Sequence, residues 1–152
     1  MRALLLLTCL AFTAMALRAN DPVISVDSDD AQMYAAIAHA KATLGSFVKI
    51  FQANGADSYS IKVPITDNGQ KEFFWLSDIS YADGKFSGTI DNDPELVHNV
   101  KIGQKMTVDS SQVADWLYMK AGKMYGNFTV RVLLPKMAPE DQAKIRALMA
   151  PE

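Results

Sequence analysis

The residues best equipped for chemistry lie in one acidic stretch of the sequence. Asp91, Asp93 and Glu95 carry carboxylates, and His98 follows them with an imidazole. Such oxygen and nitrogen atoms can bind one divalent cation together. The stretch lacks the glycine and the distal glutamate of a calcium loop, and Asp-Asn-Asp-Pro also commonly ends a strand through side-chain turns. We therefore favour a solvated loop that binds through its surface, with the candidate residues Asp91, Asn92, Asp93, Pro94 and His98.

Motifs of established enzyme classes are absent from the chain. The sequence has no nucleophile elbow, phosphate-binding loop, dinucleotide fingerprint or zinc-protease helix. Two carboxylate pairs, Asp78 with Asp91 and Asp109 with Asp115, could be brought together for acid–base catalysis. Carboxylates on exposed strands usually serve only to solvate them. The sequence therefore predicts no catalytic residue, no metal ligand and no cofactor.

Aromatic residues recur at strand spacing, at Trp75, Tyr81, Trp116, Tyr118 and Tyr125. Aromatic residues with this spacing usually belong to a core, but they can also form a binding surface. Trp116 and Tyr118 share one face of their strand, opposite Leu117 and Met119, so one of these two pairs should be exposed. We take Trp116 and Tyr118, together with the neighbouring Asp115, as a second candidate surface.

Predicted hairpins position these residues. Asp83-Gly84 lies between two alternating runs, which favours a two-residue turn because both turn positions need a positive φ. This turn places Tyr81 opposite Phe86 and Ser77 opposite Ile90. The apolar face of the hairpin then consists of Phe73, Trp75, Ile79, Tyr81, Phe86 and Ile90.

A second hairpin turn lies at Asp67-Asn68-Gly69, and two registers are open there. A two-residue turn pairs Val63 with Phe74, whereas a three-residue loop with a left-handed glycine pairs Val63 with Phe73. We prefer the three-residue loop because it joins this strand to the apolar face of the Asp83-Gly84 hairpin.

Helices are predicted on both sides of the strand region. Apolar residues repeat at helical spacing from Met33 to Phe51, and Asp29 is a suitable N-cap. This helix should end at Asn54-Gly55, where the glycine can adopt the left-handed cap. A short C-terminal helix should run from Pro139 through Met149.

Further strands are predicted at 104–108, 116–120 and 123–134, and the last two form a hairpin around Ala121-Gly122. The inward-facing residues of the final strand are Phe128, Val130, Val132 and Leu134. Because the strands come in hairpins without intervening helices, the predicted fold class is α+β. We expect an antiparallel, curled sheet of about five to six strands, covered by one long N-terminal amphipathic helix, with a short C-terminal helix.

The start of the sequence is typical of a signal peptide. Arg2 supplies a positive charge, residues 3–14 are almost unbroken apolar sequence, and cleavage is expected after Ala16 or Ala19. Cleavage removes Cys9, the only cysteine, so the exported domain would contain no disulfide. The expected organisation is a signal peptide at 1–19, a linker at 20–28, one domain at 29–137 and a C-terminal helix or tail at 138–152.

Charge and hydropathy exclude two classes of partner. The 152 residues include 15 Lys and Arg against 17 Asp and Glu, a formal net charge of −2, and the lysines are scattered singly. Nucleic-acid binding normally requires a basic face, so no nucleic acid is expected as a partner. Apart from the signal peptide, no apolar run is long enough to span a membrane, so the processed protein is not expected to be membrane-embedded.

Several features of residues 30–137 occur together in a defined order. They are Trp75 on the first hairpin strand, Gly88 with Asn92-Asp93-Pro94, the Ile102-Gly103 turn, Asp115-Trp116, and Gly126. In this combination the chain resembles the YegJ-like family of bacterial proteins of unknown function. The resemblance implies a compact α+β domain and transfers no activity and no catalytic residue. The tail from Pro139 to Glu152 lies outside it.

These observations predict a small exported domain that binds a protein or an envelope component without catalysing a reaction. An alternative is a hydrolase or metal-assisted enzyme that uses Asp91, Asp93 and His98. A third hypothesis is an inhibitor or immunity protein for a secreted toxin. Metal analysis of the purified protein separates the second hypothesis from the first, and only the gene neighbourhood separates the third from the first.

Overall fold

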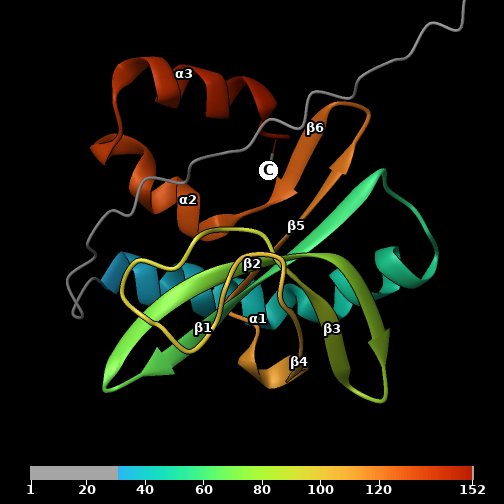
Figure 1. Cartoon of the computed structure of the whole chain (residues 1–152). Coiled ribbons are helices and arrows are strands. Elements are labelled where there is room, and N and C mark those ends of the chain that lie inside the picture. The colour runs from blue at the N-terminus through green and yellow to red at the C-terminus, as the bar shows by residue number, and fades with distance from the viewer. Residues whose placement is uncertain (1–30, 152) are drawn as a thin grey trace, which may run out of the picture.

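One open antiparallel sheet organises the protein. The computed structural model describes residues 31–151, in which six strands and three α-helices form an α+β fold (Figure 1). The strand order is β4-β3-β2-β1-β5-β6. The strands are β1 (Ser58–Asp67), β2 (Gln70–Ala82), β3 (Lys85–Ile90), β4 (Lys105–Asp109), β5 (Asp115–Lys120) and β6 (Lys123–Gly126). The helices are α1 (Ala31–Gln52), α2 (Phe128–Leu133) and α3 (Pro139–Leu148).

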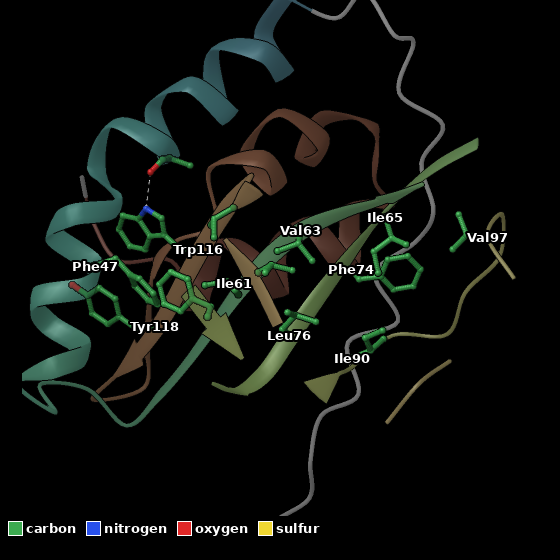
Figure 2. Close-up of a cluster of buried hydrophobic side chains, with 14 residues drawn as sticks. Phe47, Ile61, Val63, Ile65, Phe74, Leu76, Ile90, Val97, Trp116 and Tyr118 are labelled. Carbon is green, nitrogen blue, oxygen red and sulfur yellow. Dashed lines mark hydrogen bonds between the residues drawn. The ribbon is translucent and has the colours of Figure 1, made fainter. Parts of the chain in front are cut away.

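Helix α1 packs its apolar stripe against one face of the sheet (Figure 2). Phe47 is fully buried, and its ring centroid lies 5.3 Å from that of Trp116 and 6.2 Å from that of Phe86. The indole Nε1 of Trp116 donates a hydrogen bond to the carbonyl oxygen of Ala40, at 3.0 Å. The predicted N-cap of this helix, Asp29, lies outside the described residues.

The end of α1 differs in one detail from the prediction. Asn54, with φ of 50°, adopts the left-handed conformation that we expected of Gly55. The amide of Gly55 donates to the carbonyl of Ile50, at 3.0 Å. Asparagine tolerates this conformation better than most residues that carry a Cβ, so it can end a helix in the place of glycine.

The predicted three-residue loop between β1 and β2 is wrong. The turn has two residues, Asn68 and Gly69, with φ of 48° and 81°. Both positive values belong to a type I′ turn, whose twist matches that of the flanking strands. Ile61 therefore lies opposite Leu76, and the same register pairs Val63 with Phe74. Leu76 is fully buried on the face that α1 covers.

The predicted turn between β2 and β3 is confirmed near its tip and wrong further along. Tyr81 lies opposite Phe86 as expected, but Ser77 lies opposite Thr89 instead of Ile90. A β-bulge causes the shift, because Asp78 and Ile79 together oppose a single residue of β3.

The bulge exchanges the two faces of β2 along its length. Asp78 has a φ of 48°, so the strand twists locally and the alternation of side chains changes phase there. Phe74 therefore shares the core face with Phe86, whereas Phe73 and Trp75 lie on the opposite face, contrary to the prediction. Gly88 opposes the bulge, and a Cβ at this position would lie 3.0 Å from Leu76 Cβ.

The predicted long strand at 123–134 is wrong in its second half. Gly126 and Asn127 have φ of 76° and 53°, which ends β6 and starts α2. Val130, Leu133, Leu134 and Met137 form a second small core instead of one face of a strand. Helix α3 begins at Pro139, as predicted. None of the helices among residues 31–151 is long and apolar enough to cross a membrane.

Candidate functional site

The connection between β3 and β4, residues 91–104, contains most of the predicted binding residues and forms the candidate binding loop. Its first turn is fixed to the neighbouring strand β2. The amide of Asp91 donates to the carbonyl of Trp75, at 3.0 Å, and Asn92 Oδ1 accepts from the amide of Trp75, at 2.9 Å. Asn92 therefore has a structural role, because its side chain extends the ladder where the strand ends.

The centre of the binding loop is held by a single buried carboxylate. Glu72 is only 6% exposed, and it accepts hydrogen bonds from three consecutive backbone amides. The nitrogen-to-oxygen distances are 3.0 Å from Glu95, 2.9 Å from Leu96 and 3.2 Å from Val97. Bonds from backbone amides to an ionised carboxylate are stronger than neutral ones, so Glu72 fixes the path of the loop.

Two further contacts fix the end of this segment. Asp67 Oδ2 accepts from the amide of His98, at 2.9 Å, and Asn99 Nδ2 donates to the carbonyl of Thr66, at 3.1 Å. Immediately before these contacts, Val97 is fully buried in the same hydrophobic cluster as Ile65 (Figure 2). The loop is thus anchored by its backbone, by two asparagine side chains and by one buried valine.

This mode of anchoring leaves the charged side chains of the loop in solvent. Asp91, Asp93, Glu95 and His98 are all exposed, and Leu96 is 45% exposed among them. Pro94 is half-buried. The part of the chain that the structure describes contains no group of three His, Cys, Asp or Glu side chains that could hold a metal ion. The loop therefore presents an acidic surface with an apolar residue at its centre.

The second predicted surface, at Asp115, Trp116 and Tyr118, is wrong as a surface because all three residues are buried. Asp115 has no exposed area, and Trp116 and Tyr118 are 6% and 9% exposed. The ring centroids of Trp116 and Tyr118 lie 6.1 Å apart, and those of Tyr118 and Tyr125 lie 4.8 Å apart, so the three rings form one stack. Helix α1 and the start of α2 cover this face of β5, which the strand pattern alone could not reveal. The alternative pair, Leu117 and Met119, is half-buried.

Asp115 links β5 to α2. Its carboxylate accepts from the amides of Phe128 and Thr129, at 3.2 and 2.8 Å, and from the Thr129 hydroxyl, at 2.7 Å. It also accepts from the amide of Trp116, at 2.8 Å. These bonds satisfy donors that the first turn of a helix otherwise leaves unpaired. Asp115 therefore fixes the helix where the sheet ends.

Burial raises the pKa of Asp115 above its usual value of 3.8. The cause is desolvation, which disfavours the charged form, and it outweighs the hydrogen bonds from Thr129 and Trp116 and the nearby charge of Lys62. The predicted pair of Asp109 with Asp115 does not form, because Asp109 is exposed and lies 3.9 Å from the Lys85 ammonium.

Two anchoring residues, Glu72 and Asp67, were missed by sequence reasoning. Once the turn is assigned two residues, Glu72 falls opposite Ile65 and therefore on the core face. A carboxylate at a core position needs several hydrogen-bond donors around it, so a glutamate on the core face would have indicated an anchoring residue. The predicted three-residue loop placed Glu72 on the solvent face of the sheet, where a carboxylate needs no such explanation.

The matched family covers almost the whole described part of the chain. Residues 30–149 match the family described as "Uncharacterized protein conserved in bacteria (DUF2314)". The chain belongs to this family. The resemblance seen in the sequence is thereby confirmed, and the matched residues of the DUF2314 domain extend into α3, beyond the expected limit at Met137.

Two relatives of this DUF2314 chain differ in how much of their length it covers. "Uncharacterized protein YegJ" of Escherichia coli (strain K12) is 35% identical over 147 residues, which is 96% of each chain. "Putative ankyrin repeat protein NMB1133/NMB1171" of Neisseria meningitidis serogroup B (strain ATCC BAA-335 / MC58) is 30% identical over 93 residues, 58% of this chain and 36% of the relative. No solved structure matches the chain.

Proposed function

We propose that this chain is an exported, non-enzymatic binding domain that recognises another protein through the binding loop, residues 91–104. The observation that supports the proposal is that residues outside the loop hold its backbone, which leaves its own charged side chains exposed. Glu72 and Asp67 hold its backbone, while its own acidic side chains and Leu96 remain exposed. A loop held in one conformation before binding loses little conformational entropy when a partner docks.

The exposed side chains define the chemistry of the partner. Asp93 and Glu95 precede the exposed Leu96 in the loop, so a complementary surface carries basic groups beside an apolar recess. Charge complementarity of this kind speeds association and selects among partners, and the apolar contact slows dissociation. An inhibitor of a secreted toxin is one form of this function, distinguished only by the partner it binds.

Two buried carboxylates favour binding over catalysis. Asp115 and Glu72 are the buried acids of the described residues, and each is surrounded by hydrogen-bond donors of the chain itself. An acid or base must reach a proton of the substrate, and these carboxylates are already occupied by structural donors. Metal analysis of the purified protein tests the metal-assisted alternative, which requires stoichiometric zinc, manganese or calcium.

The decisive experiment changes the charge of the loop without changing its anchors. In Asp93→Asn/Glu95→Gln the backbone amides still reach Glu72, so we expect a change of less than about 0.5 kcal/mol in the free energy of unfolding. Partners crosslinked to the wild type in the exported fraction of the native bacterium should be lost. The measurement is the relative amount of each crosslinked partner by mass spectrometry.

A matched control carries the same change of charge elsewhere. Asp83→Asn/Glu140→Gln removes two exposed acids, one in the β2–β3 turn and one in α3. We expect it to capture the same partners as the wild type. Equal capture by both double variants would show that the loop is not the recognition surface, and we would then abandon the proposal.

A further inference from the structure

The outer edge of β4 has backbone groups that pair with no other strand among residues 31–151. The amide of Ser110 donates to Gly84 and that of Ile90 donates to Gln104, both at 2.9 Å. In an antiparallel ladder the hydrogen-bonded positions alternate, so Met106 and Val108 direct their backbone groups toward β3. The backbone groups of the intervening residues, Lys105, Thr107 and Asp109, consequently point away from the sheet.

The opposite edge of the sheet, at β6, is closed by the chain itself. The amide of Ala150 donates to the carbonyl of Met124, at 2.8 Å, and Met149 forms a parallel bridge with Met124. Lys123 Nζ also donates to the carbonyl of Ala147, at 2.9 Å. Within residues 31–151 the two edges are therefore unlike, and β4 is the one left open.

Charged side chains on an edge strand usually prevent pairing with another chain. On β4 their order has a different consequence. Lys105, Thr107 and Asp109 are all exposed and share one face of the strand, so that face reads basic, neutral, acidic. When two copies of this strand lie antiparallel, the basic end of each lies opposite the acidic end of the other.

We propose that β4 pairs with β4 of a second copy of this chain, antiparallel and centred on Thr107. Thr107 then faces Thr107 of the second copy, and Lys105 faces Asp109 of the second copy on both sides of the two-fold axis. On the other face of the strand, Met106 lies beside Val108 of the second copy. The two sheets join into one continuous sheet.

The charges select this register. A parallel arrangement would place each charge opposite its equivalent in the second copy, and a shift by two residues would leave Lys105 opposite Thr107. The amide of Asp109 already donates to Gln112 Oε1, at 3.0 Å, so the amides of Lys105 and Thr107 supply the backbone donors across the interface. The short strand makes this a small interface, and we expect reversible association.

Asp109 can take part because its present ion pair is weak. Its Oδ1 lies 3.9 Å from Lys85 Nζ, and the two side chains are 62% and 57% exposed. Exposed pairs of this length contribute little to stability. The carboxylate is therefore available to an ammonium group on a second copy.

Complementary charge reversal tests the proposal. In Lys105→Glu alone, and in Asp109→Lys alone, like charges meet at both ends of the interface. We expect each variant to dimerise at least about tenfold more weakly than the wild type, measured by sedimentation equilibrium. An equimolar mixture restores opposite charges at both ends, so the two variants should form heterodimers with wild-type affinity to within about threefold.

Two further variants separate edge pairing from general effects. Thr107→Pro removes an amide that points away from β3, so the variant should keep its fold by circular dichroism and lose the dimer. Lys120→Glu makes the same change of charge as Lys105→Glu at the β5–β6 turn and should dimerise like the wild type. A wild type that stays monomeric at millimolar concentration, or a mixture of charge variants that stays monomeric, would overturn the proposal. The inference does not depend on the binding loop.

Discussion

At the scale of single residues, buried carboxylates hold one loop and one helix to the strands of the sheet. Glu72 secures the binding loop to β2, and Asp115 secures α2 to β5. Each carboxylate accepts hydrogen bonds from several backbone amides. A neutral side chain of similar size could accept only some of these bonds. Their cost is desolvation, which is visible in the raised pKa of Asp115.

The raised pKa of Asp115 predicts a specific dependence of stability on pH. The folded state prefers the protonated acid, so the favourable contribution is complete below 3.8 and is lost as pH rises through the higher folded pKa. In Asp115→Asn this dependence is absent, although lost acceptors should lower stability by about 1–3 kcal/mol. Urea unfolding between about pH 3 and 7 should show the advantage of the wild type shrinking as pH rises. A difference between wild type and Asp115→Asn that stays constant with pH would contradict this account.

At the scale of elements, the junction between β6 and α2 is where the chain changes from strand to helix, and this change depends on Gly126. A Cβ on Gly126 would collide with the carbonyl oxygen of Trp116 and lie 2.5 Å from its ring, and φ is positive there. Gly126→Ala should therefore lower the free energy of unfolding by about 3 kcal/mol or more. Gly45→Ala is the control, because its Cβ meets no atom and the helix should gain up to about 1 kcal/mol. Equal effects of the two variants in chemical denaturation would refute the prediction.

The β2–β3 hairpin and the β6–α2 junction show where sequence reasoning succeeded and where it could not. The Asp83-Gly84 turn and the Tyr81–Phe86 pair followed from turn chemistry and alternation. The bulge at Asp78 did not, since residues 73–76 are all apolar, so either face of that segment could have been assigned to the core face with Ile79 and Tyr81. After Gly126, strand alternation and a short helix were compatible with the same apolar residues, and only contacts with Asp115 distinguish them.

At the scale of the whole molecule, the candidate site was predictable in part. The acidic stretch was visible as a cluster of carboxylates, but its anchoring depended on the register of β1 and β2, which the preferred turn misassigned. The exposure of Trp116 could not be judged from one strand, because the elements that bury it come from distant parts of the sequence. Burial is a property of the packed layers and not of any segment alone.

The proposed export also belongs to this scale, and it can be tested without disturbing the fold. The apolar run at 3–14 precedes all described residues, so its interruption by Leu7→Arg should block export and leave an unprocessed chain in the cell. The wild type should appear in the exported fraction, and its intact mass should match a chain that begins at Leu17 or Asn20. Leu148→Arg introduces the same charge on a side chain that is 44% exposed and should be exported normally. Recovery of full-length wild type from the cytoplasm alone would contradict the proposal, which requires that the signal peptide be cleaved on export.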